Sequence, residues 1–392
     1  MEKASGRVMA GIFLLSRLFL FILMPYSAFL GFGDQLNFYR LAQLPGWPFF
    51  HYWVEFPPFF PFLSAGLYRL AGGNEHIYCY LLAGLLTLFD AGTLLVFSRL
   101  LRVTISDGTT SLRLIIYTLF LGFFPYGWWY FDPISVFFLL LSLLFVFHNQ
   151  STRAGFAIAV GFLWKFFPIL ALIPAWMTLT RQKFLKVSLI SVTGIAFVIG
   201  FLYFVSPQMT SSSLSAQYAK GSWQTVWALL DGNHGTGNFG PLTDRQDPSL
   251  AYQKTRNPSV IPPIIPLAVG GFAGLLLLRC VGRLSTPLVC AAVTGAAWGL
   301  LILAAPGWSP QWSLYIIPLI LLALPIKQAV LFLVLLISLC LAEWPLLFSR
   351  GRDDLIWIVI VLRTVTTIGL GLVFSLKAAA SGKMKSGFLK KN

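Results

Sequence analysis

The sequence predicts an all-α membrane protein, a polytopic bundle of about 11–12 transmembrane helices of which some are half-length. Apolar residues make up 57% of the 392 positions and charged residues only 10%, against roughly 25% charged residues in soluble proteins. The apolar runs are continuous, whereas the strands of a transmembrane β-barrel alternate apolar and polar residues. This composition excludes a soluble enzyme, a disordered chain and a collagen-like fibre.

The first apolar run, from Val8 to Leu30, follows Lys3 and Arg7. It is too long for the core of a signal peptide, so we expect an uncleaved first helix that begins on the inner side. Further spans are expected at 77–98, 112–130, 133–148, 187–205, 262–278, 287–305, 312–325, 328–347 and 355–376.

The stretch 154–178 is broken at Trp164–Pro168 and has basic residues at both ends. Because loops rich in Lys and Arg stay on the cytoplasmic side, we expect two half-length helices that enter the membrane and return. The alternative, one long tilted span, would invert every later loop.

The formal net charge of +15 follows this topology. The inner side receives 17 of the 28 basic residues, namely Lys3, Arg7, Arg99, Arg102, Arg113, Arg153, Arg181, Lys183, Lys186, Arg279, Arg283, Lys327, Lys377, Lys383, Lys385, Lys390 and Lys391. The outer side receives ten of the 13 acidic residues, namely Asp34, Glu55, Glu75, Asp132, Asp231, Asp244, Asp247, Glu343, Asp353 and Asp354. We therefore expect both termini in the cytoplasm of a prokaryotic cell and assign the charge to membrane insertion, with no nucleic-acid partner.

One integral membrane domain is expected over residues 1–392. It has a first outer loop at 31–76, a second at 206–262 and a basic cytoplasmic tail at 377–392. Polar segments as long as the second loop are usually functional or disordered, and its tryptophans favour order. The four cysteines lack the spacing of a metal site and are expected to be packing residues.

Two acidic residues of the first outer loop are candidates for chemistry. Asp34 lies just beyond the first helix, where a carboxylate can remove the proton of an attacking sugar hydroxyl; the alternative is a capping or interfacial role. Glu55 is oriented by the prolines that follow it, and it is expected to assist Asp34, bind sugar hydroxyls or pair with Arg40. His51, nearby, is expected to be structural.

Two further candidates lie at helix boundaries. Asp132 precedes a proline, which is typical of a helix start, and its alternative role is in a substrate site. Lys165 lies between the two expected half-helices, and a cation at membrane depth is a functional hypothesis by default. It could hold a lipid phosphate or a carboxylate, or extend to the membrane surface.

Other charges fall within or beside apolar runs. We expect Asp90 to form a buried ion pair with Arg17 or Arg363. Arg350 and Arg352 lie at an outer helix end, where guanidinium groups could clamp a phosphate or lie in a solvated loop.

His234 is flanked by glycines that allow a ligand to approach the backbone, which could bind phosphate or sugar. The sequence contains no Walker, GxGxxG, HExxH or GxSxG motif, and the first outer loop has no DxD pair.

Several segments in order resemble a known superfamily. An acid follows the first helix, and YWVEFPPFFPF, YFDPISVFFLLLSL, GFLWKFFPILALIPAW and PGWSPQWSLYIIPL follow it. This series is similar to the C-type multi-spanning glycosyltransferases that use polyprenyl-phosphate sugars. Within them it most resembles the family 87 mannosyltransferases, which include the polyprenyl-phosphomannose-dependent enzymes of mycobacterial phosphatidylinositol mannoside synthesis. The catalytic subunit of the first GPI mannosyltransferase is a more distant relative.

The resemblance implies inverting transfer of a sugar, most simply mannose, from a polyprenyl-phosphate donor to a glycolipid or glycan acceptor on the extracytoplasmic face. Asp34 falls on the catalytic base of these enzymes, and Lys165 on the lysine of their lysine-x-x-proline segment. Gln311 falls within their proline-glutamine-aromatic segment. Leu36 stands where relatives with a metal-binding DxD carry a second acid, so no divalent metal or other cofactor is expected.

The residues expected to bind substrate are Glu55, Asp132, Lys165, His234, Gln311, Arg350 and Arg352. Two other classes stay open. A transporter or flippase of a lipid-linked or amphiphilic substrate would explain the intramembrane charges, and a non-catalytic scaffold would not need Asp34.

Overall fold

The computed structural model describes residues 5–219, 221–237, 240–252, 259–283 and 285–389, with side chains except at 217–219 and 381–389. Lys3, Lys390, Lys391 and the side chains of Lys383 and Lys385 therefore lie outside the described residues. The described part is helical throughout apart from loops and two isolated bridges. Seven helical segments are long and apolar enough to cross a membrane, and four shorter apolar helices accompany them. The chain is an integral membrane protein, as its composition predicts.

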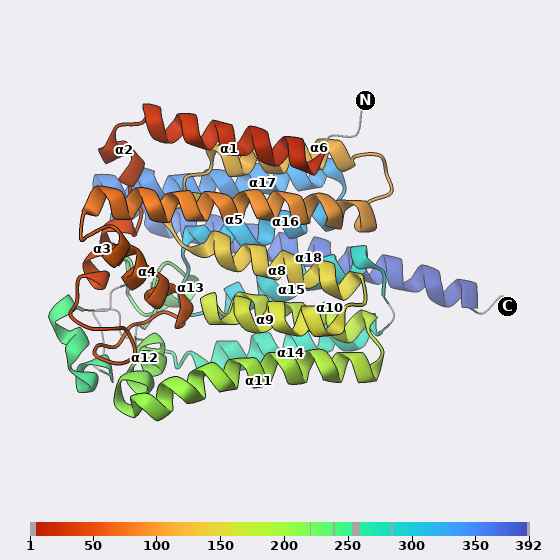
Figure 1. Ribbon diagram of the computed structural model, residues 1–392. Helices are drawn as coiled ribbons and strands as arrows, with labels where there is room; N and C mark the ends of the chain where they lie inside the picture. Colours follow the sequence, from red (N-terminus) through yellow and green to blue (C-terminus); the bar gives the residue numbers. More distant parts are fainter. Residues whose placement is uncertain (1–4, 220, 238–239, 253–258, 284, 390–392) are drawn as a thin grey trace.

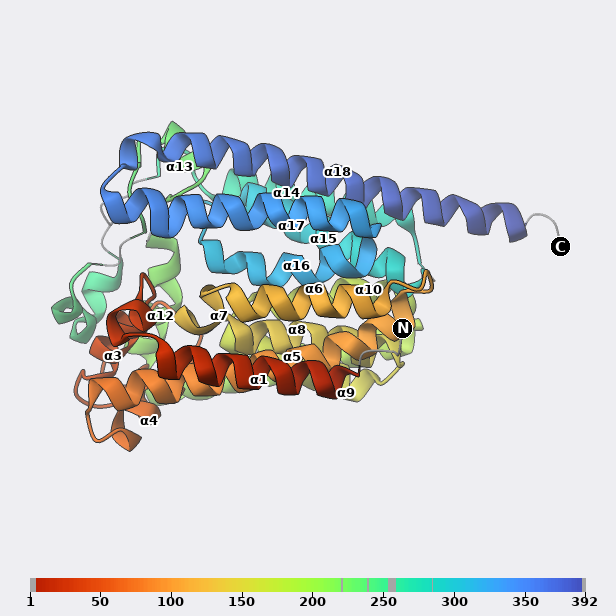
Figure 2. The same ribbon diagram turned by 90° about the horizontal axis from the view of Figure 1, so that it is seen from above.

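The long helices lie side by side and share one approximate direction (Figures 1 and 2). They are α1 (Gly6–Leu23), α5 (Glu75–Thr104), α6 (Thr110–Phe123), α8 (Asp132–Phe147), α9 (Ser151–Trp164), α11 (Arg181–Val205), α14 (Ile264–Val281), α15 (Pro287–Ala304), α16 (Ser313–Ala323), α17 (Ile326–Leu341) and α18 (Ile356–Leu389). The start of α1 and the end of α18 lie at the same end of the bundle.

Short helices gather at the opposite end, which we call the loop end (Figure 1). They are α2 (Tyr26–Leu30), α3 (Gln35–Ala42), α4 (Phe59–Leu70), α7 (Tyr126–Trp129), α12 (Pro207–Ala219) and α13 (Val226–Leu230). Short 3₁₀ helices at Leu242–Gln246 and Pro248–Tyr252 belong to the second outer loop.

Prolines divide three of the expected spans near the loop end. The residues before Pro25, Pro125 and Pro345 are extended instead of helical, because the proline ring disfavours the α conformation of the residue before it. The run from Val8 to Leu30, expected as one helix, is therefore two helices, α1 and α2. The same effect separates α7 from α6 and opens the end of α17.

The stretch 154–178 forms two half-length helices, as predicted. Helix α9 ends at Trp164, and Lys165 is extended with φ −163° and ψ 147°. A 3₁₀ helix (Phe167–Ala171) and α10 (Leu172–Thr178) then run back beside it, and α11 begins at the end where α9 began (Figure 1).

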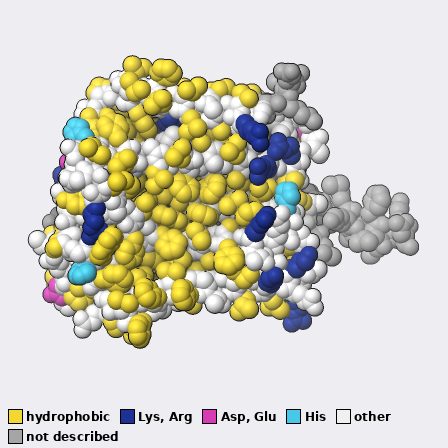
Figure 3. Space-filling model, viewed as in Figure 1, with side chains coloured by type: hydrophobic (Ala, Val, Ile, Leu, Met, Phe, Trp, Pro, Cys, Tyr) yellow, Lys and Arg dark blue, Asp and Glu magenta, His cyan; other side chains and the backbone are white. Residues whose placement is uncertain are grey.

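Helix α16 lies at the centre of the bundle, with all of its residues buried. Helix α14, at the periphery, buries only Pro266. Hydrophobic side chains cover the middle of the molecular surface, and Lys and Arg gather at the end opposite the loop end (Figure 3). We call this second end the basic end. Within the described residues, the basic side chains expected on the inner side belong to segments that meet there, whereas the ten acids expected on the outer side belong to loop-end segments.

Arginine side chains cap the ends of three helices. The last carbonyl groups of a helix have no partner in their own helix and carry partial negative charge. Two of the caps come from Arg17 and Arg113, which are 1% exposed, and a third comes from Arg283. The capped carbonyls are those of Leu121 and Phe124 for Arg17, Leu321 and Leu324 for Arg113, and Leu179 for Arg283.

Asp90 forms a close ion pair with neither Arg17 nor Arg363, the two partners expected for it. Arg17 and Asp90 face each other across Gly127, where an added methyl group would meet Asp90 Oδ2 at 2.8 Å and Arg17 Nη2 at 3.1 Å. Arg363 pairs instead with Glu343. Arg17 is turned toward the end of α6 because two carbonyl acceptors lie there.

Candidate functional site

One segment at the loop end, residues 126–132, holds the part of the chain that carries Asp34. The indole nitrogens of Trp128 and Trp129 each donate to the carbonyl of Phe29 at 3.0 Å. The hydroxyl of Tyr130 donates to the carbonyl of Phe32 at 3.2 Å. We call residues 126–132 the platform segment. It fixes the turn between α2 and α3 from one side.

Asp34 immediately precedes α3, and its backbone nitrogen donates to the carbonyl of Trp129 at 3.2 Å. Its side chain does not cap the helix; Oδ1 accepts a hydrogen bond from Asn37 Nδ2 at 3.1 Å. The carboxylate is half-buried. A partly hydrated carboxylate on a fixed backbone is suited to accept a proton.

Gly33 brings this backbone close to the platform segment. A methyl group on Gly33 would lie 2.6 Å from Cβ and 2.9 Å from Cα of Trp129. Both are closer than real Cβ contacts, so only glycine allows the turn to approach the tryptophan at this point.

Asp132 and Lys165 form a buried ion pair. From the sequence alone each of them is a candidate, but the two are not paired. Nζ of Lys165 lies 2.7 Å from Oδ1 and 2.9 Å from Oδ2 of Asp132. The Asp132 side chain is 1% exposed and the Lys165 side chain 15%. Asp132 stands in the first turn of α8, where the helix dipole favours negative charge, and the break after α9 turns Lys165 toward it.

Three carboxylates lie near enough to Tyr130 to act on its hydroxyl electrostatically. Burial raises the pKa of Tyr130 well above its usual value, and the negative charges of Asp34, Asp132 and Glu343 raise it further. Tyr130 therefore stays protonated and acts as a donor. The loop end thus brings Asp34 and the Asp132–Lys165 pair to the same neighbourhood.

Aromatic rings surround the Lys165 ammonium. Nζ lies 4.9 Å from the ring centroid of Phe131 and 5.9 Å from that of Trp312. Trp312 follows Gln311 in a 3₁₀ helix (Pro310–Trp312). Gln311 is 8% exposed, and its Oε1 atom accepts no hydrogen bond from the described residues. It therefore offers a buried acceptor next to Trp312 in the chain.

An apolar groove lies beside the break that follows α9. Its walls come from the first outer loop, the end of α9, α11 and α12, and include Phe56, Pro58, Phe166, Ile199 and Leu214. The groove is apolar over most of its surface and reaches Phe166, the neighbour of Lys165 in the chain.

Glu55 pairs with Arg245 and not with Arg40. Its carboxylate receives both terminal nitrogens of Arg245, and the two residues are 6% and 4% exposed. The expectation that Glu55 assists Asp34 or binds sugar is not supported by this geometry, because both carboxylate oxygens bind the guanidinium. His51 accepts a hydrogen bond from the backbone of Trp47 at 3.0 Å, the expected structural role.

The remaining three candidates lie on the surface. Arg352 binds Asp354 in an exposed pair at 2.9 and 3.0 Å. Arg350 and His234 are exposed. The solvated-loop interpretation of Arg350 and Arg352 is therefore the one that the geometry favours.

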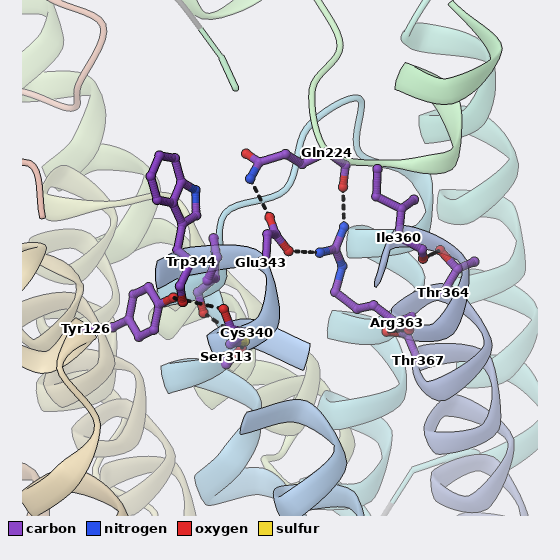
Figure 4. Close-up of polar contacts among 11 residues, drawn as sticks. Tyr126, Gln224, Ser313, Cys340, Glu343, Trp344, Ile360, Arg363, Thr364 and Thr367 are labelled. Atoms are coloured by element: carbon purple, nitrogen blue, oxygen red, sulfur yellow. Dashed lines mark hydrogen bonds and ion pairs between the residues drawn. The ribbon is translucent and has the colours of Figure 1, made fainter. Parts of the chain in front are cut away.

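Sequence reasoning missed one buried network. Glu343, expected among the outer acids, is 0% exposed. Arg363 donates to Glu343 and to the backbone carbonyl of Gln224, and the Gln224 side chain donates to Glu343 (Figure 4). The signal available in the sequence was a glutamate at the end of one apolar run and an arginine inside the next.

The described residues contain no group of three His, Cys, Asp or Glu side chains that could hold a metal ion.

Comparisons with known proteins find little similarity. No family model and no curated protein matches the sequence. Among solved structures, the fold is similar to the crystal structure of the Archaeoglobus fulgidus oligosaccharyltransferase in the apo form, with 13% sequence identity and a TM-score of 0.46. The match covers 97% of this chain, which spans 57% of the length of that protein.

Proposed function

We propose that the protein is a multi-spanning C-type glycosyltransferase that moves a sugar from a polyprenyl-phosphate donor to a glycolipid or glycan acceptor with inversion. One observation carries the proposal. The platform segment binds the backbone of Asp34 at Trp129 and contains Asp132, the partner of Lys165. A candidate base and a candidate phosphate-binding cation therefore stand on one rigid support.

Lys165 would hold the donor phosphate. An ammonium group has three donors, and Asp132 receives bonds from it at both carboxylate oxygens. A phosphate oxygen would accept the hydrogen bond that the third N–H of the ammonium can donate. The polyprenyl chain would lie in the apolar groove beside Phe166, because burying a hydrocarbon chain against apolar side chains is favourable.

The reaction would proceed by one displacement. The acceptor oxygen bonds to the anomeric carbon as the bond from that carbon to the phosphate oxygen breaks. Asp34 takes the acceptor proton, and polyprenyl phosphate leaves with the electron pair. Lys165 stabilises the charge of the leaving phosphate. Attack from the face opposite the phosphate inverts the anomeric centre.

The proposal includes mannose as the donor sugar, a mechanism without metal or other cofactor, and an active site on the extracytoplasmic side of a prokaryotic plasma membrane. Mannose follows from the resemblance in sequence, and independence of metal from Leu36 at the position of the second acid. The side of the membrane follows from the basic residues at the opposite end of the bundle.

Transport of a lipid-linked substrate was favoured by the intramembrane charges. In the structure Arg17 binds carbonyls of α6 and Lys165 binds Asp132, whereas Oδ2 of Asp90 accepts no hydrogen bond from the described residues. Two of the three charges therefore have structural partners, which weakens the case for transport against group transfer.

The test uses purified full-length protein with labelled polyprenyl-phosphate mannose and, in parallel, polyprenyl-phosphate glucose, with membrane lipid extract as acceptor. Asp34→Asn should lower turnover at least about tenfold, the lower end of what a general base contributes. Asp353→Asn, an exposed acid at the same end, should leave it unchanged. Full activity of Asp34→Asn would show that Asp34 is not the catalytic base. Movement of the labelled lipid across a vesicle membrane without a glycosidic product would favour the transporter. Activity lost in EDTA and restored by Mn²⁺ would overturn the metal-free mechanism.

A further inference from the structure

Two aromatic side chains stand together at the loop end, and one of them, Phe32, precedes Asp34 by two residues. Phe32 is 40% exposed, Trp344 is half-buried, and their ring centroids are 6.0 Å apart. We propose that this pair stacks against the ring of a hexopyranose and forms the acceptor-sugar subsite. The inference rests on the proposed function and names the acceptor class of that site.

Trp344 is held outside the helix to which its neighbours belong. Its backbone is extended, with φ −128° and ψ 130°, at the point where α17 opens. Tyr126 of the platform segment donates its hydroxyl to the carbonyl of Trp344 at 2.6 Å and to that of Cys340 at 3.1 Å. The opened turn is therefore attached to the segment that holds Asp34.

The buried Glu343 network fixes the other side of the same turn. The Glu343 carboxylate binds Arg363 of α18 and the side chain of Gln224 from the second outer loop, whereas the Trp344 indole points away from Arg363 (Figure 4). Breaking a buried ion pair is strongly destabilising, so this anchor resists displacement. Glu343 thus acts as a positioning residue for Trp344.

The position of Phe32 is also fixed by the platform segment. The hydroxyl of Tyr130 donates to its carbonyl, and its ring packs edge-on against Trp129, with centroids 6.1 Å apart and an interplanar angle of 84°. Asp34 follows two residues later. A ligand lying on Phe32 is therefore within a short distance of the proposed base.

The chemistry of this surface suits a sugar. The face of an aromatic ring carries partial negative charge and attracts polarised C–H groups, which line one face of a pyranose ring. The hydroxyl groups at the rim of the sugar need polar partners, and the hydrogen-bonded side chains of Asp34 and Asn37, which follow Phe32 in the chain, offer a carboxylate and an amide. A purely lipid-anchoring aromatic would need no such neighbours.

The competing explanation is that both rings anchor the protein at the membrane surface, where Trp is enriched. Trp357 provides the matched control, because it is a 51% exposed tryptophan near the start of α18. It lies at the same end of the bundle but takes no part in the proposed site.

The experiment measures binding of methyl α-mannopyranoside and methyl α-glucopyranoside to detergent-purified Asp34→Asn protein, by saturation-transfer NMR. At least one glycoside should receive saturation at its ring C–H protons. Trp344→Leu and Phe32→Leu should each weaken that binding about fivefold to tenfold, the effect of losing one stacked ring. Trp344→Phe should stay within about twofold of the parent, and Trp357→Leu should be unchanged. Thermal unfolding of each variant checks its folding.

The subsite is overturned if neither glycoside binds, or if Trp344→Leu and Trp357→Leu weaken binding equally in folded protein. Because binding is measured without turnover, the two proposals fail separately. If the glycoside binds to the two rings but the wild-type protein transfers no sugar, the proposed glycosyltransferase activity is contradicted and the sugar-binding site is not. If sugar transfer is unchanged in Trp344→Leu and Phe32→Leu, the proposed sugar-binding site is contradicted and the glycosyltransferase activity is not.

Discussion

Arg245 and Glu55, 190 residues apart in the chain, form a buried ion pair that joins the two outer loops. The guanidinium group also lies 4.2 Å from the ring centroid of Trp53, whose indole nitrogen donates to the carbonyls of Asp244 and Asp247 at 2.9 and 3.0 Å. These contacts make the two loops one layer over the loop end. Phe56, which follows Glu55 directly, lines the apolar groove.

Removing one partner of this pair should destabilise the protein severely. Glu55→Ala leaves the Arg245 charge buried without its counter-ion, at a cost of about 3–5 kcal/mol. A lowered thermal unfolding midpoint in detergent measures the loss. The double variant Glu55→Leu with Arg245→Met should recover most of the stability, because it buries no lone charge.

The exposed pair of Arg352 and Asp354 is the matched control. Both side chains are more than half exposed, and solvent screens such pairs, so Arg352→Ala should not shift the unfolding midpoint measurably. Equal shifts for Glu55→Ala and Arg352→Ala would show that the loop contact does not stabilise the fold.

The pair of Lys165 and Asp132 should behave differently, since we assign Lys165 a role beyond packing. Lys165→Met should both destabilise the protein, because Asp132 is left buried and charged, and abolish sugar transfer. Adding Asp132→Leu should restore the unfolding midpoint without restoring transfer. Recovery of both properties in the double variant would mean that Lys165 serves stability alone.

The positions of most helices could be predicted from the sequence because a helix that crosses the membrane needs a continuous apolar run. A span must be apolar over about 20 residues, and a proline disfavours the α conformation of the residue before it. The half-helices around Lys165 followed from the broken apolar run and the basic residues at both ends. The division of the first span at Pro25 was missed, although the proline was visible, because the apolar character continues through it.

The partners of the charged residues could not be predicted in the same way. Glu55 and Arg245 lie in separate loops, and no periodicity links them. Glu343 was assigned to the outer side without a partner because hydropathy describes one segment at a time, whereas its partner Arg363 lies on the next helix. By contrast, Asp132 and Lys165 each stood at a break between apolar runs, so both were candidates, although the carboxylate partner expected as one alternative for Lys165 was not identified.

Cysteine labelling tests the return of the chain at Lys165. Residues 150 and 182 flank the two half-helices and belong to the basic end, and residue 235 belongs to the second outer loop. In a Cys280→Ser background, which removes the one described cysteine that is exposed, cysteines at 150 and 182 should react from the same side of the membrane and a cysteine at 235 from the other. Opposite reactivity of 150 and 182 would replace the two half-helices with a single span.

Gly33→Ala tests whether the position of Asp34 matters for turnover. The added methyl group meets the backbone of Trp129 at 2.9 Å, which cannot move aside without disturbing the platform segment. The turn should shift by a few tenths of an ångström or more, and misplacing a reacting group by about 1 Å costs on the order of a hundredfold. We therefore expect kcat for sugar transfer to fall about tenfold to a hundredfold, with KM for the lipid donor little changed because Lys165 lies on another element. Gly66→Ala in α4 is the control, since nothing lies within 4 Å of its added methyl group, and it should keep full activity. If Gly33→Ala and Gly66→Ala are equally active, the close approach of Gly33 to Trp129 does not position the base, and Asp34 must reach its substrate from a more flexible turn.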